Sequence, residues 1–331
     1  HLFRESAMQR LVLVLVVSFG SLLLGYGIRL CVVEMRKKQD TTLIRLSNWL
    51  KLFTILGLQP VAIVGSFWQL SLAGIRLAIL PALGAAGILL AGLVSIALIR
   101  LERIPPSLAA SVFVSASFSN IGLFGGLIAF VLFGAAGYSL LQLYRTFEEF
   151  LYYTVGFPIS DQIARGNLHE LKFDTKAIKD RPFALIPLGG IAIGLALNLS
   201  PLPVPGWLPG LMQVIIPLLT GLLGFAIGLS LKIRTVAARK REIWTVIAVK
   251  FLIVPGVLIP LAWLLGMGNV LGGLPLKIVA IGSLMPSAFL ALVVPVIYDF
   301  DLDTANSAWL ITTAAEIVII PALYFVFGVL G

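Results

Sequence analysis

The chain has 331 residues, of which 59% are hydrophobic and only 12% are charged, and its mean hydropathy is +1.05. Soluble domains carry roughly 25% charged residues, so composition excludes an ordinary soluble fold of this length. The apolar runs are long enough for helices that cross a bilayer and too unbroken for β-barrel strands. The sequence therefore predicts an all-α, multi-pass integral membrane protein in contact with the lipid bilayer of a plasma or inner membrane.

The formal net charge of +9 does not by itself indicate a nucleic-acid partner. Lys and Arg are in excess near the cytoplasmic ends of membrane helices. Cys31 is the only cysteine, so no disulfide can form within the chain. The sequence has no His/Cys cluster for a metal, no glycine-rich phosphate loop and no GxSxG nucleophile turn. We therefore expect no metal, no cofactor, no nucleic-acid partner and no enzymatic activity.

Polar stretches divide the apolar part of the chain into ten predicted membrane helices. Each is about 20 or more residues long, which is enough to cross the hydrocarbon core. Their predicted ranges are 9–33, 43–70, 74–99, 106–134, 138–160, 182–200, 207–231, 242–266, 274–298 and 304–329.

Basic residues gather in the first, third, fifth and seventh loops, and hardly any lie in the even-numbered loops. The positive-inside rule places the odd-numbered loops in the cytoplasm. Both termini are then expected on the non-cytoplasmic side. The basic residues that carry this prediction are Arg36, Lys37, Lys38, Arg45, Arg100, Arg103, Arg165, Lys172, Lys176, Lys179, Arg181, Lys232, Arg234, Arg239, Lys240 and Arg241.

The longest polar stretch falls midway along the chain, at 161–181, and is expected to be a cytoplasmic linker. It separates a five-helix repeat at 1–160 from a second at 182–331. An odd number of helices in each half makes the two repeats inverted. A weak internal match supports this, because SFSNIGLFGG from Ser117 aligns with SLMPSAFLAL from Ser283 and places Asn120 opposite Pro286. The alternative is chance similarity between apolar helices.

Two of the predicted helices contain residues that favour an interruption of the helix at membrane depth. In the fourth helix, Asn120 followed by Gly122 can unwind a few residues, and in the ninth Pro286 removes a backbone donor. If both breaks meet, the N-termini of two half-helices suit an anion. The alternatives are a Ser/Gly packing seam and a simple kink. The candidate substrate-binding residues are Ser117, Ser119, Asn120, Gly122, Ser283, Pro286, Ser287 and, more weakly, Gln59.

Ionisable side chains at membrane depth are costly and usually face a partner or water. In the fifth helix, Arg145 precedes Glu148 and Glu149 by three and four residues, so it can pair with either and leave the other unpaired. Lys250 in the eighth helix and Glu316 in the tenth can pair with each other. An unpaired glutamate can carry a proton or bind Na⁺ through oxygen ligands. The coupling candidates are Glu148, Glu149, Glu316 and Lys250, and the sequence does not choose between H⁺ and Na⁺ as the coupling ion.

Four stretches together are similar to one known family. They are Gly25-Tyr26-Gly27, SFSNIGLFGG from Ser117, GLSLKIR from Gly228 and MPSAFLALVVPVIYDFDLD from Met285. In order and spacing the chain resembles the auxin efflux carrier family, including its bacterial members, within the bile acid/sodium symporter-like superfamily. The resemblance implies ten helices in inverted repeats, with helices four and nine broken and crossing, and a scaffold domain packed against a crossover domain. The sequence departs from the family at Ile121, where Thr is frequent, and at Leu127, where Pro is common.

The leading hypothesis is a secondary active transporter that moves a small carboxylate-type organic anion by alternating access, as an elevator, either coupled to protons or as a uniporter. One alternative is a sodium-coupled symporter like the bile acid branch of the superfamily. Another is a membrane sensor that binds a ligand without moving it. The oligomeric state is open, with a homodimer among the alternatives.

Overall fold

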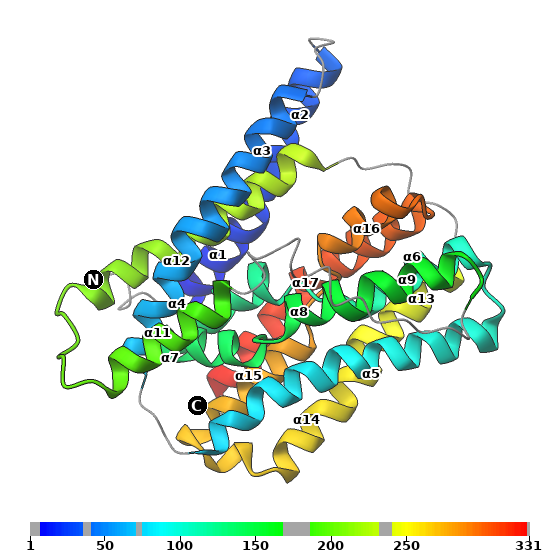
Figure 1. The fold of residues 1–331 in the computed structure, drawn as a ribbon. Coiled ribbons are helices and arrows are strands. Elements are labelled where there is room, and N and C mark those ends of the chain that lie inside the picture. Colours follow the sequence, from blue (N-terminus) through cyan, green and yellow to red (C-terminus); the bar gives the residue numbers. More distant parts are fainter. Residues whose placement is uncertain (1–6, 36–40, 71–74, 168–185, 232–239, 330–331) are drawn as a thin grey trace.

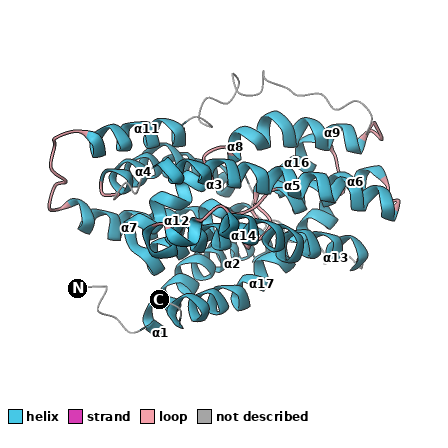
Figure 2. Ribbon diagram, turned by 90° about the horizontal axis from the view of Figure 1, so that it is seen from below, coloured by secondary structure: helices cyan, strands magenta, loops and turns pink. Residues whose placement is uncertain are grey.

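The computed structural model describes residues 7–35, 41–70, 75–167, 186–231 and 240–329. Within these ranges the chain forms helices and loops without any strand (Figures 1 and 2). A helix satisfies its own backbone hydrogen bonds, which a segment in contact with lipid must do. The all-α prediction is confirmed for the described residues.

Short π-helical or 3-10 turns (η) join many of the α-helices into longer rods. In the first half of the sequence the elements are α1 (Ala7–Leu15), η1 (Val16–Gly20), α2 (Ser21–Leu30), η2 (Cys31–Met35), α3 (Thr41–Phe53), η3 (Thr54–Leu58), α4 (Gln59–Trp68), η4 (Ile75–Ala78), α5 (Ile79–Glu102), α6 (Pro106–Ser117), η5 (Ile121–Gly125), α7 (Gly126–Tyr144), α8 (Glu148–Leu151), η6 (Tyr152–Gly156) and α9 (Phe157–Ala164). In the second half they are α11 (Ile186–Leu199), α12 (Leu208–Ser230), α13 (Lys240–Ala248), η8 (Val249–Ile253), α14 (Val254–Leu264), η9 (Met267–Asn269), η10 (Leu271–Gly273), α15 (Leu274–Ser283), α16 (Leu290–Tyr298) and α17 (Leu302–Val329).

Seven helical stretches of the described chain are long and apolar enough to cross a bilayer, which makes this a multi-pass membrane protein. Three further apolar helices, Pro106–Ser117, Ile186–Leu199 and Leu271–Ser283, are shorter. The count of ten crossings therefore stays a prediction. The seven long stretches are Gln9–Val33, Thr41–Trp68, Arg76–Glu102, Ile121–Ala164, Leu208–Ser230, Lys240–Leu264 and Leu302–Phe327.

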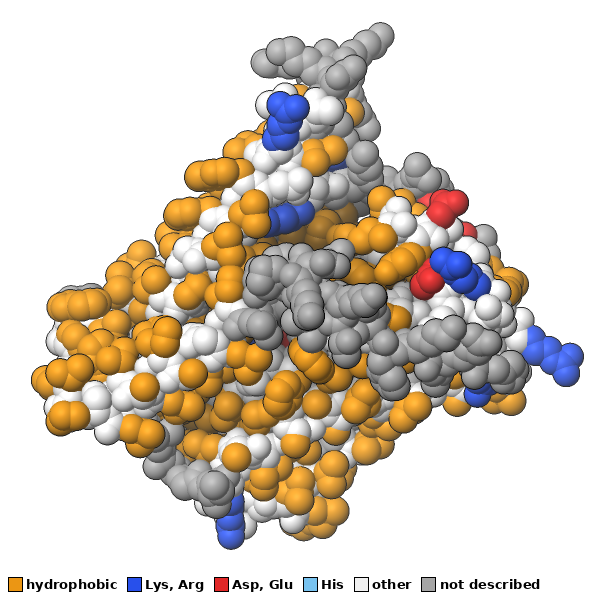
Figure 3. Space-filling view, viewed as in Figure 1, with side chains coloured by type: hydrophobic (Ala, Val, Ile, Leu, Met, Phe, Trp, Pro, Cys, Tyr) orange, Lys and Arg blue, Asp and Glu red, His pale blue; other side chains and the backbone are white. Residues whose placement is uncertain are grey.

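The outer surface of the molecule is apolar. Leu264, Val318 and Phe325 have exposed fractions of 73%, 72% and 70%. On the face drawn in Figure 3, hydrophobic side chains predominate and most of the Lys and Arg side chains lie near the edges. Soluble monomers rarely expose large continuous apolar patches, whereas a lipid-facing surface requires them.

One group of helices forms around α12, which packs along α2, α3 and α4, while α11 packs along α4. Figure 1 shows α2, α3 and α12 side by side, projecting from the rest of the molecule. The backbones of α2 and α12 approach closely because a Cβ on Gly25 would collide with the carbonyl oxygen of Phe225, and one on Gly228 with that of Leu22. Small residues commonly permit such approach between membrane helices.

A second group contains α5, α6, α9 and α13 to α17, which contact one another, and α7 touches both groups. The repeat boundaries at 1–160 and 182–331 stay predictions. Helix α9 continues to Ala164, so the first residues assigned to the 161–181 linker are helical. The remainder of that linker, from residue 168, lies outside the described residues.

The fourth and fifth predicted helices differ in detail from the prediction. The chain reverses at Gly134, whose φ of 65° and ψ of −156° suit glycine alone. The predicted helix at 138–160 is not continuous, because α7 ends at Tyr144 and α8 begins at Glu148. This interruption places Arg145 in a turn beside the centre of the molecule.

Candidate functional site

The fourth predicted helix is interrupted where the sequence predicted a break. Helix α6 ends at Ser117, and Phe118 is extended with φ −91° and ψ 122°. Asn120 is also non-helical, with φ −88° and ψ 52°, before helical structure resumes at Ile121. Three residues, 118–120, therefore separate two half-helices.

The ninth predicted helix is interrupted in the same way around Pro286. Helix α15 ends at Ser283 and α16 begins at Leu290. A proline cannot donate the backbone hydrogen bond that a continuous helix would need there. The break predicted at Pro286 is therefore present.

The two interrupted segments meet and pair through a short antiparallel β-bridge. Ser119 and Ser287 form an isolated β-bridge. The Asn120 N–H donates to the Pro286 carbonyl oxygen at 2.8 Å, and the Ala288 N–H donates to the Phe118 carbonyl oxygen at 2.9 Å. The Ser287 hydroxyl also donates to the Ser115 carbonyl oxygen at 2.6 Å. The predicted meeting of the two breaks is thus observed, and the pairing centres on the two serines. We call this junction the crossing.

A cavity of about 370 Å³ lies beside the crossing. Of the candidate residues, six line it: Gln59, Ser119, Asn120, Gly122, Glu148 and Glu149. Ser283 and Lys250 instead line a space of about 20 Å³ that also contacts Ser119. Ser117 borders a third cavity of about 80 Å³. Pro286, Ser287 and Glu316 line none of these cavities, so they belong to the framework around the crossing.

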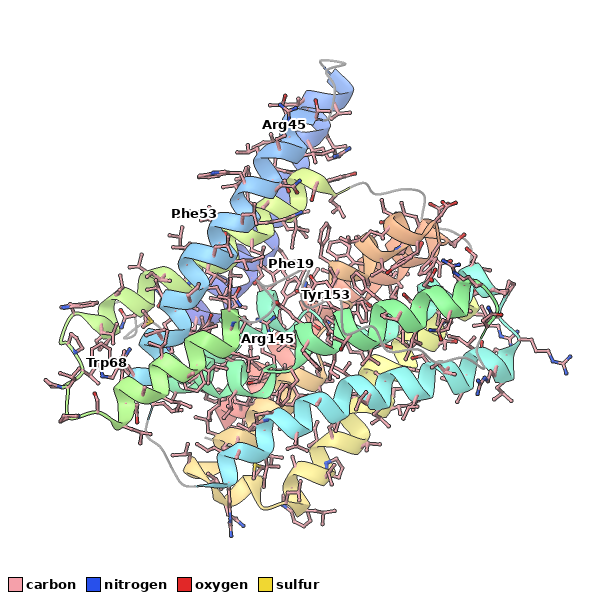
Figure 4. All side chains as sticks on the ribbon, in the orientation of Figure 1. Phe19, Arg45, Phe53, Trp68, Arg145 and Tyr153 are labelled. Atoms are coloured by element: carbon pink, nitrogen blue, oxygen red, sulfur yellow. The ribbon has the colours of Figure 1, made fainter. Side chains whose placement is uncertain are left out.

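Arg145 holds both glutamates of the fifth predicted helix. Its Nε donates to Glu148, and its Nη2 lies 3.7 Å from Glu149 Oε1. The prediction that one glutamate remains unpaired is wrong, because a guanidinium carries five N–H donors and reaches both carboxylates from the turn before α8. Gly122 makes room for this group, since a Cβ there would lie 2.7 Å from Arg145 Nη1. Figure 4 places Arg145 near the middle of the molecule, whereas Arg45 lies toward the outer end of α3.

A chain of hydrogen bonds runs from this ion pair through the crossing. Tyr152 donates its hydroxyl to Glu148 Oε1 at 3.2 Å and accepts the Ser119 N–H at 2.7 Å. On the other side, Lys250 Nζ donates to Ser119 Oγ at 2.9 Å. Ser119 therefore joins the cavity to a buried lysine on η8.

Lys250 and Glu316, which the sequence allows to pair, form no ion pair within 4.0 Å. Glu316 on α17 is completely buried, and neither carboxylate oxygen has a hydrogen-bond partner. The hydrogen bond of Lys250 goes instead to Ser119 of the crossing.

The sequence-based prediction found only Gln59 of one wall of the cavity, which is formed by α3, η3 and the first residue of α4. Asn48, Lys51, Ile55 and Gln59 all line the cavity. They follow one another at intervals of three and four residues, which places them on one face of a helix. That spacing was the available signal, because polar side chains recur on one face of an otherwise apolar helix. Leu219, Leu223 and Ile227 of α12, which packs along α3, also line the cavity.

No model of a known protein family matches the chain, and no curated protein sequence matches it. Across the described ranges, no group of three or more His, Cys, Asp or Glu side chains could hold a metal ion. The fold and site define a multi-pass helical membrane protein with a cavity beside two interrupted helices that cross. The resemblance to the auxin efflux carrier family stays a prediction.

Proposed function

We propose that this protein is a secondary active transporter that moves a small organic anion across the membrane by alternating access. The observation that carries the proposal is the cavity at the crossing of two interrupted helices. Gly122 and Leu123 of η5 and Leu290 of α16 line it, so the first turns of two half-helices border the same space. Helix N-termini have free N–H groups and a positive dipole end, and both favour an anion.

We further propose ten membrane helices in two inverted repeats, 1–160 and 182–331, with both termini on the non-cytoplasmic side. One break lies in each proposed repeat, and the meeting of the two breaks at Ser119 and Ser287 supports this arrangement. The helices around α12 would form the scaffold, and those around the crossing would form the moving domain, as in the auxin efflux carrier family. Because Cys31 is the only cysteine, labelling of single cysteines placed in each loop of a Cys31→Ser background with an impermeant thiol reagent tests the topology.

Uptake and counterflow in proteoliposomes with a panel of radiolabelled carboxylates test the transport function. Asn120→Ala removes a side-chain amide that lines the cavity, and Pro286→Ala restores the backbone donor whose absence interrupts the ninth predicted helix. Each variant should reduce uptake at least about tenfold. Ser95→Ala is the matched control, since Ser95 is buried in α5 and bonds only within its own helix. Full activity in both crossing variants contradicts the site, and binding without counterflow supports a sensor instead.

For coupling, we propose protons, carried by Glu316, Glu148 or Glu149. The Lys250 ammonium already places a positive charge next to Ser119, which leaves less need for a bound metal cation there. Uptake should respond to an imposed pH gradient and remain unchanged when Na⁺ is replaced by N-methylglucamine. Dependence on Na⁺ at fixed pH supports sodium symport, and indifference to both gradients supports a uniporter.

A further inference from the structure

Lys51 brings a positive charge to the cavity that no acidic side chain neutralises. Its Nζ donates to Ser230 Oγ at 3.0 Å and lies 4.6 Å from the centre of the Phe289 ring. Among the described residues, no carboxylate lies within 4.0 Å of it. The other cation that lines the cavity, Arg145, is already held by two glutamates. Of the cations that line this cavity, Lys51 is therefore the one that can pair with an anionic ligand.

Two buried amide groups add unpartnered donors to the same cavity. Gln59 and Asn120 are only 7% and 8% exposed, and the Nε2 of Gln59 and the Nδ2 of Asn120 have no hydrogen-bond partner. A buried donor without an acceptor costs free energy, and an acceptor-rich ligand would remove that cost. The polar side of the cavity thus combines an ammonium with two free amide donors.

The remaining wall of the cavity is apolar and belongs to three different parts of the fold. Ile55 comes from η3, Leu219 and Leu223 from α12, and Val293 from α16. Such a wall favours a hydrocarbon or aromatic body that leaves water on binding. A highly polar ligand, or one with several charges, would lose hydration there without compensation.

We propose that Lys51 supplies the counter-charge that selects a monoanionic ligand with an apolar body. The inference rests on the proposed anion transport and identifies the residue that distinguishes the charge of the substrate. A single uncompensated ammonium balances a single negative charge. A second negative charge on the ligand would meet the carboxylates of Glu148 and Glu149, which line the same cavity.

Lys51 also lies where the two groups of helices meet. Its own helix α3 and its partner Ser230 on α12 belong to one group, whereas Phe289 belongs to the crossing. An anion bound by this ammonium would therefore contact both sides of the interface that alternating access must rearrange.

Binding of shape-matched probes to the purified protein, measured by isothermal titration, tests the proposal. The probes are phenylacetate, benzoate and hexanoate, each with its neutral amide. The wild-type protein should bind at least one of these anions at least about tenfold more tightly than its amide, which equals about 1.4 kcal/mol. Lys51→Met should abolish that preference while binding the amide as before. Lys51→Arg should keep the preference, because it keeps the charge.

Lys277→Met is the matched control, since Lys277 also lies over an aromatic ring, 5.7 Å from the centre of Phe133, but does not line this cavity. It should bind every probe as the wild type does. Unchanged affinity of Lys51→Met for an anion that Asn120→Ala no longer binds overturns the role of Lys51 and leaves the proposed function standing. Failure of the wild-type protein to bind or transport any carboxylate overturns both.

Discussion

The ion pair that Arg145 forms with Glu148 and Glu149, all of which line the cavity, gives the most specific prediction about stability. Arg145→Met removes the guanidinium that contacts Glu148 and Glu149, whose side chains are 3% and 24% exposed. Breaking a buried ion pair by removing one partner typically costs about 3–5 kcal/mol, because an uncompensated charge remains buried. We expect a loss of that size here, since Glu148 has almost no access to solvent.

A second variant distinguishes the stability lost through the unpaired carboxylate from the stability lost through missing packing contacts. Arg145→Met combined with Glu148→Gln leaves no fully buried charge at this ion pair, and the amide oxygen can still accept from Tyr152. This double variant should recover most of the loss. Arg165→Met is the control, since Arg165 is 68% exposed and pairs with Asp161 at 3.0 Å. Exposed pairs contribute about 0.2–1 kcal/mol, so the control should lose less than about 1 kcal/mol.

Equilibrium unfolding in mixed micelles measures all three variants against the wild type. Two results would refute the reasoning. One is a loss for Arg145→Met no larger than that for Arg165→Met, and the other is a double variant as unstable as the single one. Either result would mean that the buried carboxylates are not neutralised by this guanidinium.

Three further predictions concern packing and coupling. Gly228→Val should destabilise the protein by about 1–3 kcal/mol in thermal unfolding, because even a Cβ would lie 2.7 Å from Tyr26 N. Gly27→Val should change little, since nothing lies within 4 Å of its added Cβ. Ser119→Ala should cost about 1–3 kcal/mol in the same assay, because the buried Lys250 ammonium loses its hydrogen-bond acceptor. Glu316→Gln should fold normally and retain counterflow while its uptake loses the response to a pH gradient; an intact response would exclude Glu316 as the proton carrier.

The breaks in the helices could be predicted from sequence because their causes are local. Pro286 lacks a backbone donor, and Asn120 followed by Gly122 tolerates non-helical backbone. The membrane class followed from composition alone, because 59% hydrophobic and only 12% charged residues exclude an ordinary soluble fold of this length. That the two broken helices cross was implied by the resemblance to the auxin efflux carrier family. These features depend on residue type and position along the chain.

The side chains that reach the cavity could be predicted less well because their partners depend on packing. Spacing within a continuous helix allowed Arg145 one glutamate, but the turn between Tyr144 and Glu148 lets it hold two. The contact of Lys51 with Phe289 could not be predicted, because it depends on how α3 packs against the crossing. The π-helical turns could not be predicted either, because they lie within continuous, largely apolar segments of the sequence.

Ser119 connects Lys250 on one side of the site with Tyr152 and Glu148 on the other through hydrogen bonds. Its hydroxyl accepts from Lys250, and its N–H donates to the tyrosine bound to Glu148. Its neighbour Asn120 presents an unpartnered amide to the cavity and bonds to Pro286 through its backbone. A ligand that binds the amide therefore acts one residue away from Ser119, which is linked through Tyr152 to Glu148, one of the proposed proton carriers. Coupling between anion and proton then needs no long route through the protein, because a small shift at residues 119 and 120 changes both sets of contacts together.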